Sequence, residues 1–315
     1  MSATRREFLA LGAGLGAARS LARVVPAAGI PPASARDELF RISLAQWSLH
    51  RRLRAGALDA LDFPGYARGE FGIEAVEYVN PFFPDKAVDF DWLEKLRARA
   101  ERAGVRSLLI MIDGEGELAA ADDEARRKAV ENHFEWIAAA KFLGCHSIRV
   151  NAAGEGAWEE RRDRAADSLR RLGDLGGEYG VNVIVENHGG LSSNGKWLAE
   201  VMQRAGHSRV GTLPDFGNFR VSPSEEYDRY EGTRELMPWA RGVSAKSYAF
   251  DARGEETTID FHRMLRIVLA AGYHGHLGIE YEGEAPSEPE GVRLTQRLLE
   301  RVRDEIAAED AEEGR

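Results

Sequence analysis

The chain contains one cysteine and no excess of positive charge, and both shortages exclude classes of protein. With Cys145 alone among 315 residues, neither an intrachain disulfide nor a cysteine-based zinc cluster can form, and we expect this residue to fill the core. The net charge of −10 repels phosphate backbones, which argues against a nucleic-acid partner. Hydrophobic residues make up 43% of the chain, which is enough to exclude wholesale disorder.

The first 35 residues follow the order of an export signal. A twin-arginine pair, Arg5 and Arg6, precedes an uncharged run over 8–18, and Ala33-Ser34-Ala35 is a small-x-small cleavage signal. The run is shorter than the about 20 apolar residues that span a bilayer, so we expect no stable membrane insertion. We predict a twin-arginine signal peptide over 1–35, recognised by the twin-arginine export machinery, and a periplasmic or extracellular mature protein. The alternative is an amphipathic helix belonging to the domain.

A strand–helix unit repeats eight times along the rest of the chain. Short β-rich runs recur about 30–40 residues apart, which is the length of one βα unit, and they begin near residues 42, 73, 105, 146, 181, 210, 242 and 276. Between them lie helical patterns with charged faces over 91–103, 122–143, 158–179, 195–205, 260–271 and 291–307.

The composition of these units favours a closed barrel. The strands are apolar with few charges, as in parallel strands covered on both faces. No G-x-G-x-x-G motif follows the first strand, which disfavours a dinucleotide-binding fold. We predict the α/β class, with a single (β/α)8 TIM barrel over 36–307 and a disordered acidic tail over 308–315.

Three carboxylates occupy the predicted carboxyl ends of strands, where barrel enzymes build their active sites. Glu186, Asp215 and Glu280 end the fifth, sixth and eighth strands. Their mutual repulsion in one mouth requires protons, the cations Lys246 and Arg149, or a divalent metal. Oxygen donors suit Mn²⁺, Mg²⁺ or Co²⁺. Simpler roles stay open: a turn cap for the aspartate, and ion pairing for the lysine and arginine.

Other polar residues at strand ends are candidates for substrate binding. Side chains two residues apart share a strand face, which places His188 beside the fifth-strand glutamate. We expect the Glu282 side chain to be a surface charge. The aromatic residues Trp47, Phe82, Phe83 and Trp197 wall a sugar pocket or pack in the core. The candidate substrate-binding residues are His188, Arg149, Asn151, Glu77 and Asn218.

Three motifs together resemble the sugar phosphate isomerase/epimerase superfamily of xylose isomerase-like barrels, over roughly residues 40–303. They are Val185-Glu186-Asn187-His188, Pro214-Asp215-Phe216-Gly217-Asn218 and Gly278-Ile279-Glu280-Tyr281-Glu282-Gly283, with Ala271-Gly272-Tyr273-His274-Gly275 before the last. The resemblance implies that Glu186, Asp215 and Glu280 bind one divalent metal ion, Mn, Co, Mg or Zn.

Two positions depart from the pattern of that family. Ser244 stands where the family usually has a metal-binding histidine on the seventh strand, and Asn218 stands where many members have a histidine three residues after the aspartate. The first change removes a usual metal ligand, and the second removes a usual substrate contact.

The resemblance also implies a reaction. Glu186 and Glu280 exchange a proton on a carbon next to a sugar carbonyl, and Lys246 or Arg149 holds the developing oxyanion. We therefore expect a metal-dependent sugar isomerase or epimerase. The same chemistry can expel a β-leaving group, so a lyase that releases the aglycone of a keto-glycoside is the alternative. A non-catalytic carbohydrate-binding barrel is a further alternative, whereas a nuclease of this superfamily would need a basic groove.

Overall fold

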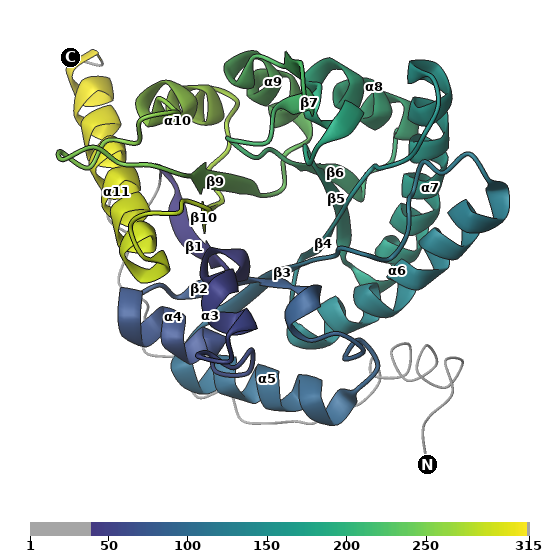
Figure 1. Ribbon diagram of the computed structural model, residues 1–315, viewed down its shortest axis with the longest axis horizontal. Helices are drawn as coiled ribbons and strands as arrows, with labels where there is room; N and C mark the ends of the chain where they lie inside the picture. The colour runs from purple at the N-terminus through teal and green to yellow at the C-terminus, as the bar shows by residue number, and fades with distance from the viewer. Residues whose placement is uncertain (1–38, 314–315) are drawn as a thin grey trace.

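The computed structural model describes residues 39–313. The predicted signal peptide over 1–35 lies outside these residues. Within them the chain alternates strands and helices, and Figure 1 shows the strands in a ring with the helices outside it.

Eight parallel strands form one curled sheet, which confirms the predicted TIM barrel. The spatial order is β6-β5-β4-β3-β2-β1-β10-β9, so consecutive βα units are neighbours. The eight strands correspond to the eight predicted β-rich runs: β1 Arg41–Ala45, β2 Ala75–Val79, β3 Arg106–Met111, β4 Ser147–Val150, β5 Asn182–Glu186, β6 Val210–Leu213, β9 Val243–Ser247 and β10 His276–Tyr281.

The barrel closes between β6 and β9 through isolated contacts instead of a continuous ladder. Parallel bridges join Thr212 to Ala240 and Asp215 to Ser244. The Ser244 amide donates to the Pro214 carbonyl at 2.9 Å, and the Phe216 amide donates to the Ser244 carbonyl at 3.1 Å. We call this closure the seam, and it holds Asp215 beside β9.

The six predicted helices are present on the outside of the barrel. Several begin at an Asp or Asn whose side chain accepts an amide hydrogen bond, as Asp122 does from Ala125 at 2.7 Å. Glycines in the left-handed conformation end several of them, such as Gly104 with φ 66°. The helices are α5 Phe90–Ala103, α6 Asp123–Leu143, α7 Trp158–Tyr179, α8 Gly195–Ala205, α10 Phe261–Ala270 and α11 Glu288–Glu313.

Short elements fill the loops and were not predicted, because each is too short to show a hydrophobic period. They are the helices α3 His50–Arg54, α4 Phe63–Phe71 and α9 Arg229–Leu236, the hairpin of β7 Arg220–Ser222 and β8 Glu225–Glu226, and the 3-10 turns η1 Gln46–Leu49, η2 Asn80–Phe82, η3 Gly190–Ser193 and η4 Met237–Trp239.

The acidic C-terminal segment differs from the prediction of a disordered tail. Helix α11 continues through residues 308–313 as far as Glu313. Arg266 on α10 forms ion pairs with Glu309 and Asp310, and His262 Nε2 lies 3.1 Å from Glu309 Oε1. Composition alone missed these partners, because they come from a different helix.

Apolar side chains form a shell between sheet and helices and a smaller cluster inside the barrel. Cys145 is buried in the shell, which confirms the expectation for this residue. The described residues contain no helix that is both long and apolar enough to cross a bilayer. The inner cluster consists of Ala45, Val79, Leu109, Met111, Ile184 and Leu213.

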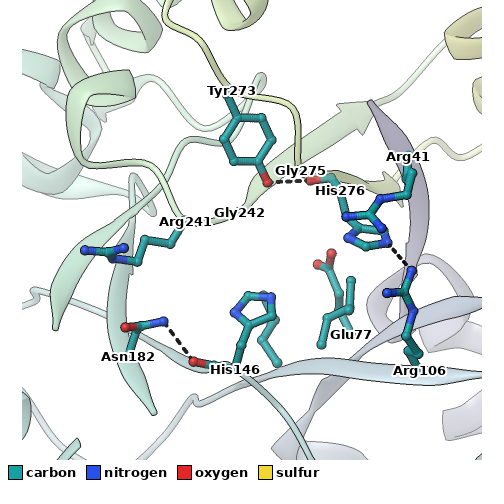
Figure 2. A pocket seen from close by; sticks show the side chains of 12 residues that line it. Arg41, Glu77, Arg106, His146, Asn182, Arg241, Gly242, Tyr273, Gly275 and His276 are labelled. Carbon is teal, nitrogen blue, oxygen red and sulfur yellow. Dashed lines mark hydrogen bonds between the residues drawn. The ribbon is translucent and has the colours of Figure 1, made fainter. Parts of the chain in front are cut away.

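The barrel has polar residues at both ends. The C-terminal mouth is the end where Glu186, Asp215 and Glu280 lie. The N-terminal mouth is a cavity of about 370 Å³ at the opposite end, ringed by residues at or just before strand starts, including Arg41 and Arg106 (Figure 2).

Candidate active site

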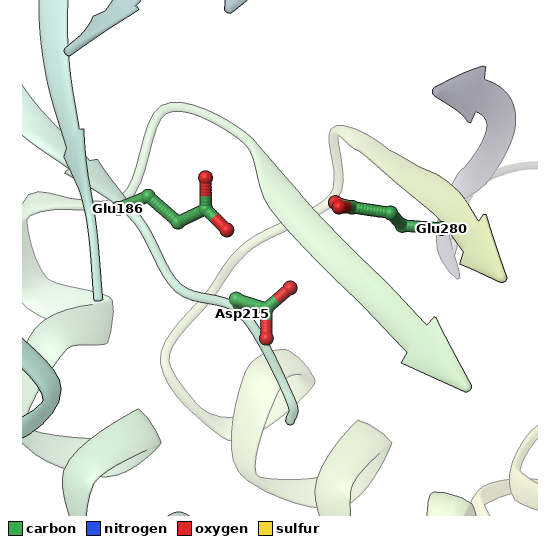
Figure 3. A group of neighbouring side chains, drawn as sticks. All are labelled: Glu186, Asp215 and Glu280. Carbon is green, nitrogen blue, oxygen red and sulfur yellow. The ribbon is translucent and has the colours of Figure 1, made fainter. Parts of the chain in front are cut away.

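Three strands bring three buried carboxylates together at the C-terminal mouth. Glu186 ends β5, Asp215 follows β6 along the seam, and Glu280 lies near the end of β10. Their relative exposures are 0%, 0% and 4%, and one carboxylate oxygen from each lies within 4.8 Å of the other two. Figure 3 shows the three side chains pointing toward one another. The predicted convergence of these residues is therefore confirmed.

Glu186 is held by one cation and one amide. Arg149 Nε lies 2.8 Å from its Oε2, and Asn218 Nδ2 donates to its Oε1 at 3.0 Å. Burial raises the pKa of Glu186 to about 7, since desolvation and the negative Glu280 outweigh the attraction of Arg149. The side chain can therefore both accept and give up a proton near neutral pH.

Asp215 uses its two oxygens differently. Its Oδ1 accepts from the amides of Gly217 at 2.8 Å and Asn218 at 2.7 Å, so it does cap the turn after β6. Its Oδ2 is buried without a hydrogen-bond partner. Burial raises the pKa of Asp215 to about 7 against the opposing charge of Lys246. One oxygen is therefore committed to the backbone, and the other is available to a ligand.

Glu280 is held in its charged form. Ser244 Oγ donates to its Oε2 at 2.8 Å, and Lys246 Nζ lies 3.2 Å from its Oε1. Burial opposes ionisation, but Lys246 and the Ser244 hydrogen bond outweigh it and lower the pKa of Glu280. The serine that departs from the family pattern thus supports a carboxylate of the site directly.

Lys246 is the central cation of the mouth. Its side chain is 2% exposed, and Nζ lies 3.5 Å from Asp215, 3.2 Å from Glu280 and 3.1 Å from Glu282. Glu282 also accepts from the Trp47 indole, so the expectation that it is a surface charge is wrong. The turn η1 brings the tryptophan over it, a contact between the two ends of the barrel sequence that no local pattern reveals.

Arg149 connects Glu186 to a polar group that the sequence analysis missed. Its Nη1 donates to Asp113 at 2.6 Å, and Asn151 Nδ2 donates to the same oxygen at 2.8 Å. Burial opposes the charge of Asp113, but Arg149 and Asn151 prevail and lower its pKa. The signal was available, because Asp113 follows the apolar run of β3 directly.

The predicted substrate-binding residues separate into two groups. Arg149, Asn151 and Asn218 lie in the network around Glu186. His188 is exposed at the same mouth, and desolvation together with the charges of Arg149 and Lys246 lowers its pKa.

Glu77 does not lie with the other predicted residues. Strand β2 continues past it to Val79, which places Glu77 in the barrel interior, and its side chain lines the N-terminal mouth. Ser43 Oγ donates to its Oε1 at 2.7 Å. The expected location at the C-terminal mouth is therefore corrected: β2 runs two residues beyond Glu77, so this side chain does not stand at the carboxyl end of the strand.

Aromatic and amide side chains extend the C-terminal mouth. Trp47 and Phe82 have ring centroids 5.8 Å apart and pack on the inner cluster, whereas Phe83 and Trp197 are buried in the outer shell. The Gln46 Nε2 is buried without a hydrogen-bond partner. A cavity of about 480 Å³ is lined by Asn218 and by residues of the segments around it, including Gly189, Ser193, Gly217, Arg220 and Tyr248.

The donor set at the C-terminal mouth fits a divalent metal ion. Glu186 Oε2 and Asp215 Oδ2 are buried oxygens that no hydrogen bond satisfies, although cations lie near both. Carboxylate oxygens are the ligands that Mg²⁺ and Mn²⁺ prefer. The buried acidic triad could therefore hold a metal, with Lys246 sharing two of its carboxylates.

Short stretches of the chain are similar to curated proteins. The chain is 36% identical over 87 residues, 26% of its length, to the 3'-dehydrocarminate deglycosidase alpha subunit of Microbacterium sp.. It is 39% identical over 49 residues, 16% of its length, to the C-glycoside deglycosidase alpha subunit of Arthrobacter globiformis. These matches span 25% and 13% of the relatives' own lengths.

Solved structures share the fold over most of the chain. A 3-keto-D-glucoside 4-epimerase from E. coli has a TM-score of 0.65 at 15% identity, over 82% of this chain and 98% of that one. An L-ribulose 3-epimerase has a TM-score of 0.66 at 16% identity, over 87% and 97%. The IOLI protein with a bound zinc atom has a TM-score of 0.66 at 13% identity, over 84% and 99%.

The family assignment covers most of the barrel. Residues 67–302, which include all three carboxylates and Lys246, match the family described as xylose isomerase-like TIM barrel. Together with the eight-stranded barrel and the site at its C-terminal mouth, this match shows that the chain belongs to the xylose isomerase-like TIM barrel family.

Proposed function

We propose that the protein is a divalent-metal-dependent enzyme that abstracts a proton next to the carbonyl of a sugar or sugar derivative, and so isomerises or epimerises it. One observation carries the proposal: Glu186 and Glu280 face one another across a buried cluster of three carboxylates. Two carboxyl groups placed in this way can act as an acid–base pair. The similar epimerase structures support the substrate class.

Glu186, Asp215 and Glu280 would hold the metal ion, in agreement with their unsatisfied or shared oxygens. Bound there, a divalent cation supplies Lewis acidity toward the substrate's carbonyl and hydroxyl oxygens. The similar structures include one with magnesium and one with zinc, which supports a metal without selecting one.

The two glutamates divide the proton transfer between them. Glu280 is held ionised by Lys246 and Ser244, so it is ready to accept the proton on the α-carbon. Glu186, whose pKa is about 7, can return a proton from the other side of the same carbon. Lys246 lies between the carboxylates and can donate a hydrogen bond to the oxygen that becomes negative.

Exchange of α-protons with solvent tests the reaction before the natural sugar is known. Keto-sugars and keto-glycosides incubated in D₂O should gain deuterium next to the carbonyl, as measured by NMR. Glu186→Gln and Glu280→Gln should each slow the exchange about 100-fold or more, because each removes an acid–base group. Exchange near the wild-type rate in both variants would overturn the proposal. Sugar binding without any exchange would favour the non-catalytic carbohydrate-binding barrel.

Elimination of an aglycone is a second candidate, and the deglycosidase relatives favour it. In a 3-keto-glycoside the carbon at position 2 is acidic, because it is adjacent to the carbonyl. Proton transfer from C2 to Glu280 leaves an electron pair that forms the C1–C2 double bond. The C1–aglycone bond breaks, its electron pair leaves with the aglycone, and a proton from Glu186 neutralises the released group. Release of free aglycone identifies this reaction, whereas an isomeric sugar alone identifies epimerisation.

The metal has its own test, independent of substrate. Purified wild-type protein should contain about one Mn, Co, Mg or Zn per chain by elemental analysis. Glu280→Gln should lose it, whereas the matched control Glu282→Gln should keep it, because Glu282 contacts Lys246 but lies outside the triad. Equal metal contents in wild type and Glu280→Gln would show that the ion binds elsewhere.

We further propose that the twin-arginine pair directs export, so that the enzyme meets its sugar outside the cytoplasm. Arg5 and Arg6 support this interpretation by their position before an apolar run. Substituting both with lysine should retain the protein in the cytoplasmic fraction. An unchanged distribution would contradict the proposal.

A further inference from the structure

The N-terminal mouth is a second polar cavity, outside the site described above. It has a volume of about 370 Å³, at the lower end of the range for small-molecule sites. Barrel enzymes place their catalytic residues at the opposite end. The fold by itself therefore does not require a charged cavity at the N-terminal mouth.

Three arginines around this cavity have no carboxylate partner within ion-pair distance among residues 39–313. They are Arg41 at the start of β1, Arg106 at the start of β3 and Arg241 before β9. Arg106 Nη2 lies 3.3 Å from His276 Nε2, and Arg241 Nη2 donates to the Ser208 carbonyl at 2.7 Å. In a chain of net charge −10, unpaired guanidinium groups at one mouth concentrate positive charge there.

Burial favours the uncharged form of the two imidazoles at this mouth. Burial, reinforced by the charges of Arg41 and Arg106, lowers the pKa of His276 to about 3. Desolvation and Arg241 likewise lower the pKa of His146. Neutral imidazoles offer hydrogen bonds without adding charge, so the positive charge of the cavity comes from the arginines.

A carboxyl group lies at the floor of the cavity. Glu77 is 2% exposed, and its Oε2 is buried without a hydrogen-bond partner. Figure 2 shows this carboxyl pointing into the open centre between the surrounding residues. The fold leaves room for it, because a Cβ on Gly278 would lie 2.6 Å from both of its oxygens. A buried oxygen of this kind calls for a partner that reaches into the cavity.

We propose that the N-terminal mouth binds a small hydroxylated carboxylate, a sugar acid. Its oxyanion lies against Arg41 and Arg106, with His276 between them, and its hydroxyl group reaches Glu77. Guanidinium groups recognise carboxylate and phosphate alike, whereas the carboxyl at the floor recognises hydroxyl groups. The site is independent of the reaction proposed for the C-terminal mouth.

Calorimetric titration of the purified protein tests this assignment with three probes: D-gluconate, inorganic phosphate and D-glucose. Gluconate should bind more tightly than phosphate, because it alone can use both the arginines and Glu77. Glucose lacks the oxyanion and should bind this site too weakly to detect. Binding of phosphate without gluconate, or no saturable binding of either anion at millimolar concentration, would overturn the proposal.

Variants locate the binding. Arg106→Gln and Arg41→Gln should each weaken both anions about tenfold, the loss expected for one charge-assisted contact. Glu77→Gln should weaken gluconate while leaving phosphate unchanged. Arg97→Gln is the matched control, because Arg97 is an exposed arginine that pairs with Glu94. Circular dichroism confirms folding of each variant. Affinities unchanged in both Arg41 and Arg106 variants would place the anion elsewhere and overturn the assignment.

Discussion

The two mouths of the barrel are built from the same strands but differ in their charged side chains. Carboxylates predominate at the C-terminal mouth, and arginines predominate at the N-terminal mouth. At the C-terminal mouth, carboxylates outnumber the cations Lys246 and Arg149. At the N-terminal mouth, unpaired arginines surround the single carboxyl of Glu77. In β10, His276 faces one mouth and Glu280, four residues later, faces the other. One strand face can therefore serve two ligands of opposite charge.

The comparison shows how each mouth accommodates a buried carboxyl group. Glu280 is ionised because a lysine and a serine contact it, whereas Glu77 has a serine and no cation, so its pKa is raised to about 7. Partners decide the protonation state, since both side chains are equally removed from water. This contrast can be broken by changing the partners.

The largest effect should come from removing the central cation. Lys246→Met leaves the carboxylates of Asp215 and Glu280 buried without their ammonium, and breaking such a pair costs about 3–5 kcal/mol of unfolding free energy. Urea denaturation in EDTA should show this loss, and Mn²⁺ should reverse most of it by supplying positive charge.

An exposed lysine provides the control for that experiment. Lys86 pairs with Asp89 at 2.7 Å, and both side chains are more than a third exposed. Lys86→Met should therefore cost less than about 1 kcal/mol. A loss in Lys246→Met that Mn²⁺ leaves untouched would show that the lysine acts by packing and not by charge.

The pH dependence of stability should change when Glu77 is neutralised. The pKa of Glu77 is raised from 4.5 unfolded to about 7 folded, mainly by burial, with Glu280 and Glu186 adding to the shift. Between these values the folded protein keeps a proton that the unfolded chain releases, so stability falls as the pH rises. The total is about 3 kcal/mol by pH linkage.

Glu77→Gln should remove that decline. The variant should gain about 3 kcal/mol relative to wild type between pH 4.5 and 7.5, measured by urea denaturation at each pH. Ser43→Ala should shift the decline in stability to higher pH, because the Ser43 hydrogen bond lowers the pKa of Glu77 in the wild type. If the unfolding free energies of wild type and Glu77→Gln changed with pH in the same way, Glu77 would not be the buried acid that causes the decline.

A smaller effect should follow from filling the space beside Glu77. Gly278→Ala places a Cβ 2.6 Å from both carboxyl oxygens, and such overpacking costs about 1–3 kcal/mol. Gly65→Ala is the matched control, because Gly65 lies in α4 with nothing within 4 Å of an added Cβ. It should be neutral or stabilising in thermal denaturation. Equal destabilisation in both variants would show that the Glu77 contact does not matter.

The smallest effect should be at the C-terminal end, away from both mouths. Arg266→Ala removes the ion pairs to Glu309 and Asp310, which are about half-exposed and therefore contribute little to stability. Hydrogen exchange should nevertheless increase in the last turns of α11. Unchanged exchange there would show that the helix extension does not depend on these pairs.

Much of this molecule could be predicted from sequence, because its regular parts have regular causes. Apolar runs separated by helical patterns gave all eight strands and six helices, and the strand ends gave the triad. Two of the wrong predictions share one origin, which is contact between distant segments. Glu282 meets Lys246 and Trp47 only after the barrel closes, and Glu309 meets Arg266 only after two helices pack. Glu77 was misplaced for a different reason, because it lies in the middle of β2 and not at its carboxyl end.

The seam between β6 and β9 is the part of the barrel where a change in sequence disturbs the strand ladders least. The long segment between these strands, residues 214–242, carries α9 and the β7–β8 hairpin without interrupting a continuous ladder. Replacements in its exposed hairpin, residues 220–226, would alter one wall of the cavity of about 480 Å³ while leaving the other seven strand pairings untouched. A library randomised in that hairpin, and not at the buried Asp215, Phe216 or Phe219, would therefore change the cavity wall at little risk to folding.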